Sequence, residues 1–136
     1  MNSDASNLPS GLPGIVSAEE PLARFLRHSN HFNTQGISYR AFLPNLKNME
    51  VSVQRDDDNT RLRMHAGKTM EGHIYGVGIV STKIVRELKL DARAQEPPER
   101  HANIVGWLSD NDSVNAKAQN KDDADVLARN AAMFQW

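Results

Sequence analysis

Short segments in which apolar and polar residues alternate are the feature that most limits what this chain can fold into. In MEVSVQR, Met49, Val51 and Val53 alternate with polar neighbours. A period of two is typical of a strand with one buried face. Alternating or continuous apolar patterns predict a sheet built from Ile37–Leu43, Met49–Gln54, Ile74–Val80, Leu88–Ala94 and His101–Trp107.

Two further segments are read as a helix and as an ambiguous stretch. Leu22, Phe25 and Leu26 have the spacing of one helical face, so EEPLARFLRHSN predicts a short first helix. Thr60–Gly72 fits either a strand or a helix, because its apolar residues match both periods. We favour a strand there and leave the helix open.

The C-terminal segment predicts the clearest helix. Asn120 suits an N-cap, and the acidic residues that follow it suit the positive end of a helix. One apolar face of this helix comprises Ala124, Leu127, Ala128, Ala131 and Phe134. Hairpin-like strands with few helices predict an α+β fold, a mixed or antiparallel sheet of about four to five strands with the C-terminal helix packed on one face.

The length of 136 residues suits one domain with its own core. Residues 1–16 are rich in Ser, Asn, Pro and Gly, and we expect a flexible N-terminal arm there. Residues 17–136 are then a single α+β domain. The five residues Pro44–Asn48 suit a hairpin connection between two of the expected strands.

The composition excludes several classes of protein. The chain has no cysteine, which removes disulfides, thiolate zinc sites and cysteine nucleophiles. The net charge of −1 gives no overall attraction to nucleic acid or to an anionic membrane. No signal-peptide pattern and no apolar run of about 20 residues is present, so we expect a cytoplasmic protein with no membrane partner.

The stretch GHIYGVGIVSTKIVREL resembles a phosphate loop only superficially. Ser81 stands where a dinucleotide fingerprint needs its third glycine, and the spacing of a P-loop is also absent. Gly76 and Gly78 instead lie on one side of the expected strand and leave a flat groove for close approach of another element. Ser81 or Thr82 then begins a short helix.

The chain shows no motif for a cofactor or a metal, and we expect neither. His28 and His31 have a conceivable zinc spacing, but no third ligand is marked. The acidic run Asp56–Asp58 reads as a solvated turn. Asp110, Asp112 and the acidic residues Asp122, Asp123 and Asp125 are divided between a loop and a helix start.

One alternative is a small enzyme that acts on an anionic substrate. His101 opens a strand, where it could move a proton, while Arg40 and Arg55 could hold the anion. This catalytic hypothesis requires the three residues to share one cleft.

A second alternative is nucleic-acid binding. The segment from Arg61 to Arg93 contains seven basic residues and three acidic ones. Arg61 and Arg63 are the candidate binding residues of this basic surface. Tyr75 is the one aromatic residue in the stretch, whereas single-strand binders interleave several. Nucleic acid is therefore possible but not favoured.

The favoured function is a non-enzymatic binding or accessory module. No nucleophile motif, metal set or phosphate loop is found. Trp107 and Tyr75 are candidate binding residues, and Trp136 is expected to dock on the body or on a second subunit. We expect a homo-oligomer or a protein partner, with the ligand unidentified.

Overall fold

The structure is a computed structural model that describes residues 7–109, 111 and 114–136. In this part of the chain a six-stranded antiparallel sheet has the order β6-β7-β4-β1-β5-β8, and a two-stranded sheet pairs β2 with β3. The strands are β1 (Pro21–Leu26), β2 (Phe32–Asn33), β3 (Gly36–Ile37), β4 (Val51–Gln54), β5 (Gly76–Ser81), β6 (Asp91–Ala94), β7 (His101–Val105) and β8 (Ala132–Gln135).

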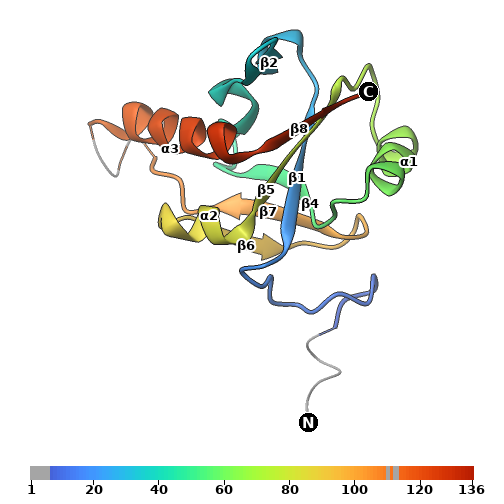
Figure 1. Cartoon of the computed structure of the whole chain (residues 1–136). Coiled ribbons are helices and arrows are strands. Elements are labelled where there is room, and N and C mark those ends of the chain that lie inside the picture. Colours follow the sequence, from blue (N-terminus) through green and yellow to red (C-terminus); the bar gives the residue numbers. More distant parts are fainter. Residues whose placement is uncertain (1–6, 110, 112–113) are drawn as a thin grey trace.

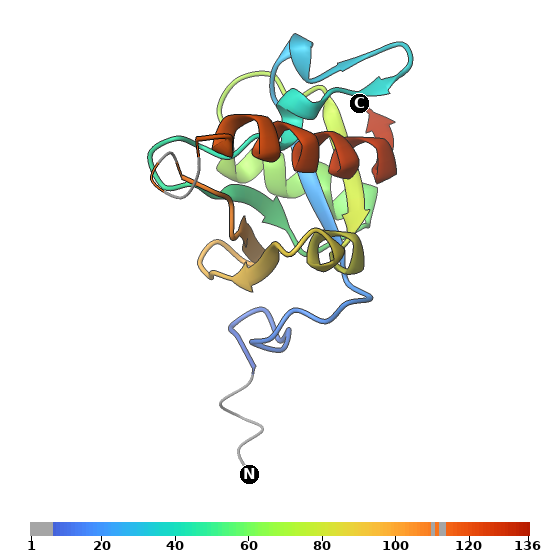
Figure 2. The same ribbon diagram turned by 90° about the vertical axis from the view of Figure 1, so that its left-hand side faces the viewer.

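The helices lie on both sides of the sheet. One face is covered by α3 (Ala116–Asn130), α2 (Thr82–Glu87) and the 3-10 turn η3 (Tyr39–Phe42). The other face is covered in part by α1 (Asn59–Thr69), and a second 3-10 turn, η2 (Ser29–His31), precedes β2. Figure 1 shows α3 and α1 on opposite sides of the molecule, and Figure 2 shows α3 crossing in front of the strands. The α+β class and the packed C-terminal helix are confirmed, with a sheet of six strands.

The first predicted helix is wrong, because its residues form the central strand β1. Leu22 and Leu26 are buried in the larger core on the α3 side of the sheet. Ala23 and Phe25 are buried in a smaller core on the α1 side. A strand buried on both faces is apolar at nearly every position, so it also satisfies the spacing of a helix.

The predicted strand Ile37–Leu43 is also wrong beyond its first residue. The Ser38 hydroxyl accepts a hydrogen bond from the backbone N–H of Arg40 and caps η3. Ala41 and Phe42 are fully buried, and η3 packs against α3. Pro44–Asn48 consequently does not close a hairpin, and β4 pairs with β7 and β1.

The ambiguous segment Thr60–Gly72 is largely helical, so the preference for a strand is wrong. The Asp58 carboxylate accepts a hydrogen bond from the backbone N–H of Arg61 at 2.9 Å and caps α1. Leu62 and Ala66, four residues apart, are the buried positions of this helix. The cap and this spacing decide in favour of the helix.

The C-terminal helix begins and ends earlier than predicted. Asn120 lies inside α3 rather than at its cap, and its side-chain amide bonds the backbone N–H and C=O of Leu108 at 3.1 and 2.7 Å. Ala124, Leu127 and Ala128 are buried as expected. The chain leaves the helix at Ala131 and adds β8 to the sheet beside β5. The helical assignment of Phe134 is therefore wrong.

Four predicted strands are confirmed as β4, β5, β6 and β7, each shorter than predicted, and β5 ends one residue later, at Ser81. Met49, Lys89 and Gly106 have positive φ angles and lie outside the strands. The close approach predicted at the two glycines of β5 is confirmed. A Cβ at Gly78 would strike the Ile37 side chain, and a Cβ at Gly76 would strike the β8 backbone.

The described part of the N-terminal segment lies at the foot of the molecule (Figure 1). Ser10 bonds both carboxylate oxygens of Glu96, through its N–H at 3.0 Å and its hydroxyl at 2.5 Å. Val16 is buried in the main core, whereas Ile15 is exposed. Among the described residues, no helix combines the length and apolar character needed to cross a bilayer.

Candidate functional site

The sheet opens into a fork between two of its central strands. β1 and β4 share the single register pair Ala23↔Gln54 and then separate. Arg24 fills the fork, because its Nε donates to the Ala41 carbonyl at 2.8 Å and its Nη1 donates to the Ser52 carbonyl at 3.0 Å. A guanidinium thus takes the place of backbone hydrogen bonds between the strands.

Three hollows that share lining residues lie at this fork and beside it. The first, of about 240 Å³, lies between β1, β4, α1 and the chain before β7. The second, of about 360 Å³, shares Arg24, Arg27 and Ser52 with the first. The third, of about 600 Å³, shares Arg27 and Arg40 with the second. We call the three hollows the cationic trough, after its basic lining residues Arg24, Arg27, His28, His31, Arg40, His65 and His101.

The charge of this trough is not neutralised from within. Among the lining residues of the three hollows, all in the described part of the chain, Glu50 is the one carboxylate. The ion pairs of the described residues include none with Arg24, Arg27 or Arg40. Outside the trough, four arginines are paired, at Arg55–Glu20, Arg61–Asp56, Arg86–Asp91 and Arg129–Asp125, whereas Arg63, Arg93 and Arg100 have no ion pair with a described residue. The three trough arginines therefore present uncompensated positive charge.

The pKa values in the trough reflect burial first and the neighbouring positive charges second. Burial, and then the nearby Arg27, lowers the pKa of Arg24 to about 10, which leaves its guanidinium charged at neutral pH. Burial, followed by Arg24 and two further basic neighbours, lowers the pKa of His31 to about 4. The His31 Nδ1 accepts a hydrogen bond from the Arg27 backbone N–H at 3.3 Å, which agrees with a neutral ring.

One aromatic ring, that of Tyr39, supports the outer part of the trough. The guanidinium carbon of Arg40 lies 4.9 Å from the centre of the Tyr39 ring, and the Lys121 ammonium lies 4.8 Å from the same centre. A cation over a ring is attracted by its negative face. The charge of Arg40 is thus positioned by a ring rather than by a carboxylate.

The inner part of the trough holds two imidazoles. The Ser52 hydroxyl lies 2.6 Å from the His101 Nε2, and the His101 Nδ1 lies 2.9 Å from the Gln95 carbonyl oxygen. His65, on α1, stacks on Phe25 with ring centres 6.2 Å apart. Burial, and then the neighbouring His101, lowers the pKa of His65. This end of the trough therefore combines a hydroxyl, two imidazoles and two arginines.

The three residues of the catalytic hypothesis are not all brought together. His101 lines the first hollow, and Arg40 lines the second and third. Arg55 lines none of the three, because its side chain is fully buried in the pair with Glu20. Two of the three residues thus belong to one trough, in different parts of it.

The four predicted binding residues do not lie together at one site. Trp107 is buried in the core, and its indole N–H donates to the Ile104 carbonyl. Tyr75 lines the third hollow and packs against Phe32. Arg61, on α1, pairs with Asp56, which precedes the helix, and Arg63 lies over the ring of Trp136.

The basic residues from Arg61 to Arg93 lie on separate elements. Those of α1 are Arg61, Arg63 and Lys68, whereas α2 carries Lys83 and Arg86. Figure 1 shows α1 and α2 on different sides of the sheet. Nucleic-acid binding by this set stays a prediction.

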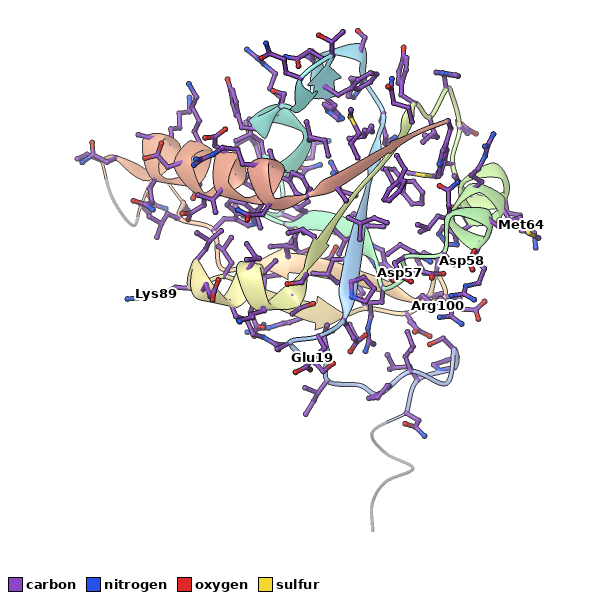
Figure 3. The ribbon with its side chains drawn as sticks, in the orientation of Figure 1. Glu19, Asp57, Asp58, Met64, Lys89 and Arg100 are labelled. Carbon is purple, nitrogen blue, oxygen red and sulfur yellow. The ribbon has the colours of Figure 1, made fainter. Side chains whose placement is uncertain are left out.

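The prediction of a solvated turn at Asp56–Asp58 is wrong for Asp56, which is buried and paired with Arg61, and Asp58 instead caps α1. Figure 3 shows Asp57 and Asp58 at the start of α1, with Arg100 beneath them. Asp110 and Asp112 lie outside the described residues. In the part of the chain that the structure describes, no three His, Asp or Glu side chains gather as a metal site.

The sequence reasoning missed Arg24, Arg27, Ser52 and His65. A signal for the two arginines was present, because the stretch RFLRHSNH carries two arginines and two histidines without a carboxylate. Ser52 and His65 had no such signal, since one stands in an alternating strand and the other in a segment of ambiguous period.

The fold and the site define an α+β protein with a cationic trough at a fork in its sheet. Comparisons with models of protein families, with curated proteins and with solved structures found no match to this chain.

Proposed function

We propose that this chain is a binding module for an anionic ligand that carries phosphate or carboxylate groups and sits in the cationic trough. The observation that carries the proposal is the absence of an ion-pair partner for Arg24, Arg27 and Arg40 among the described residues. The favoured expectation from the sequence was a binding module of unidentified ligand. The cationic trough supports, in addition, a ligand that is negatively charged.

The chemistry of the arginines supports a ligand with paired oxygen atoms. A guanidinium presents its N–H groups in a planar fork that matches two oxygens of a phosphate or carboxylate. Arg24 uses its Nε and Nη1 for the sheet, and its Nη2 donates to none of the described residues. Arg27 and Arg40 are exposed in the same trough, where they can approach a ligand from its other sides.

Isothermal titration calorimetry with inorganic pyrophosphate at low salt tests this proposal. The double variant Arg27→Gln, Arg40→Gln is expected to bind at least about tenfold more weakly than the wild type, since each tenfold step corresponds to about 1.4 kcal/mol. Both side chains are exposed, so their replacement leaves the core intact. Binding by the wild type is expected to weaken as salt is added.

A matched control separates the trough from overall charge. The double variant Lys83→Gln, Arg129→Gln removes the same charge from exposed positions on α2 and α3. It is expected to bind pyrophosphate as the wild type does. An equal loss in both double variants, or no binding by the wild type, would overturn the proposal.

Self-association is a second candidate, and the topology of the sheet favours it. β6 and β8 are the two edges of the six-stranded sheet, and each has one strand neighbour. An edge strand has backbone groups that can pair with another chain. Light scattering coupled to size-exclusion chromatography tests this candidate, and a monomer at all concentrations would reject it.

A further inference from the structure

Ser52 and His101 lie together on the open face of the sheet, at the inner end of the cationic trough. β4 and β7 pair so that Ser52 stands opposite Asn103 and Gln54 stands opposite His101. Ser52 and His101 are thus diagonal neighbours on one face, where side chains interact across strands. The Ser52 Oγ and the His101 Nε2 are 2.6 Å apart.

The hydrogen bond on the other side of the ring assigns the proton of His101. Its Nδ1 is 2.9 Å from the Gln95 main-chain oxygen, and a carbonyl oxygen can only accept. The neutral ring therefore carries its proton on Nδ1 and has a lone pair on Nε2. The Ser52 hydroxyl then donates to that lone pair. Ser52 is thus placed as a nucleophile, His101 as its base, and the Gln95 carbonyl as the group that orients the base.

The first hollow, which Ser52 and His101 line, suits one chemical class of electrophile. Its lining residues, as far as the described part of the chain shows, include Arg24 and Arg27 and no carboxylate. Arg24 is fixed beside the nucleophile, because its Nη1 donates to the carbonyl of Ser52 itself. Arginines around a phosphoryl group neutralise its charge and stabilise the charge of the transition state. A phosphate ester is thus the electrophile that this hollow suits.

We propose that Ser52, activated by His101, is the nucleophile of a phosphate-ester hydrolysis in which Arg24 and Arg27 hold the phosphoryl group. This inference rests on the anion binding proposed above and adds a reaction to it. The Ser52 Oγ forms a bond to phosphorus, and its proton passes to the His101 Nε2. The bond from phosphorus to the ester oxygen breaks, and the leaving alcohol takes the proton from His101.

Water completes the cycle. It attacks the phosphorus of phosphorylated Ser52 and gives one proton to the His101 Nε2. The bond from Oγ to phosphorus breaks, and Ser52 takes the proton back. The sum is one phosphate ester and one water converted to one alcohol and one phosphate.

The test follows hydrolysis of 4-nitrophenyl phosphate by the full chain. Acid quenching and peptide mass spectrometry of the wild type are expected to find a phosphoryl group on Ser52. Ser52→Ala and His101→Gln are each expected to lower the rate about a hundredfold or more. Ser81→Ala and His73→Gln are matched controls outside the trough, and their rates are expected to equal that of the wild type.

Two readouts keep this inference separate from the binding proposal. Pyrophosphate binding by the wild type without turnover would overturn the nucleophile and leave the anion site standing. If the wild type shows no pyrophosphate binding and no turnover, both proposals are overturned. Turnover that survives Ser52→Ala, or hydrolysis of neutral 4-nitrophenyl acetate alone, would also overturn the inference. The phosphopeptide is mapped on the wild type, so this readout does not depend on the folding of any variant.

Discussion

Arg55 binds both carboxylate oxygens of Glu20 from inside the protein, with its Nε 2.8 Å from one oxygen and its Nη2 2.9 Å from the other. Its Nη1 donates to the Pro13 carbonyl at 2.8 Å, so one guanidinium joins the end of β4 to the chain before β1. Burial raises the pKa of Glu20, but the bonds from Arg55 and from Ser17 outweigh this effect and bring the pKa below its ordinary value.

Replacing Arg55 by Ala is expected to lower the free energy of unfolding by about 3 kcal/mol, because it leaves a partly buried carboxylate without its partner. Urea denaturation followed by circular dichroism measures the change. Arg129→Ala breaks the exposed pair with Asp125 and is expected to cost less than about 0.5 kcal/mol. Equal effects of the two substitutions would contradict a structural role of the buried pair.

His31 makes stability depend on pH in a defined direction. Its pKa is lowered to about 4 in the folded protein from an ordinary value of 6.5, so the unfolded chain binds more protons between these values. This part of the stability is fully present above pH 6.5 and is lost as the pH falls toward 4, by up to about 3 kcal/mol. His31→Asn retains an acceptor for the Arg27 N–H and does not titrate. Between pH 7 and pH 4 the free energy of unfolding is expected to depend less on pH in this variant than in the wild type. An unchanged pH dependence would rule out His31 as the cause.

Two glycines are expected to respond in opposite ways to replacement by Ala. Gly76 has a φ of +154°, and a Cβ there would strike the β8 backbone, so Gly76→Ala is expected to destabilise by about 2 kcal/mol. Gly67 lies in α1 with open space around its Cα, so Gly67→Ala is expected to stabilise by about 0.5–1 kcal/mol. Thermal unfolding of both variants checks the signs, and a stable Gly76→Ala protein would show that β8 does not pack there.

The last residue of the chain is expected to contribute to stability. The Trp136 ring meets the Phe25 ring edge-on at 5.9 Å, and its indole N–H donates to the Asn59 side chain at 2.6 Å. Trp136→Ala is expected to cost about 2 kcal/mol through lost burial and the lost hydrogen bond. Phe134→Ala, on β8 just before Trp136 and 46% exposed, is expected to cost less than half as much. Guanidinium denaturation compares the two, and the reverse order would place Trp136 away from the body.

The sequence predicts strands that alternate, such as β4, and also β5, which is buried on both faces but is rich in valine and isoleucine. It mistakes β1 and β8, which have neither signal. β4 alternates and was found, because Ser52 is exposed between buried Val51 and Val53. β1 is buried on both faces and has no alternation to detect. β8 is four residues long and directly follows a helix, so its Phe134 continued the helical spacing by coincidence. Period alone does not separate these cases.

The site was harder to predict than the fold, because it depends on where strands stop pairing. Arg24 and Arg27 were visible as a basic run, yet on the expected helix they would have faced solvent. Ser52 and His101 are 49 positions apart, and the β4–β7 register brings them together. Arg55, predicted as a ligand-binding residue, is held instead by Glu20, which precedes β1.

The fork between β1 and β4 also determines how a ligand can approach. Arg24 donates to the carbonyl oxygens of Ala41 and Ser52, so an anion that drew the guanidinium away would break both bonds and leave the partly buried Ala41 acceptor without this donor. An anion that meets only the remaining amino group avoids that loss. The trough thus selects ligands that contact Arg24 while its bonds to the two backbone carbonyls stay in place. A substitution of Arg24 that weakens ligand binding is therefore also expected to weaken the contact between β1 and β4.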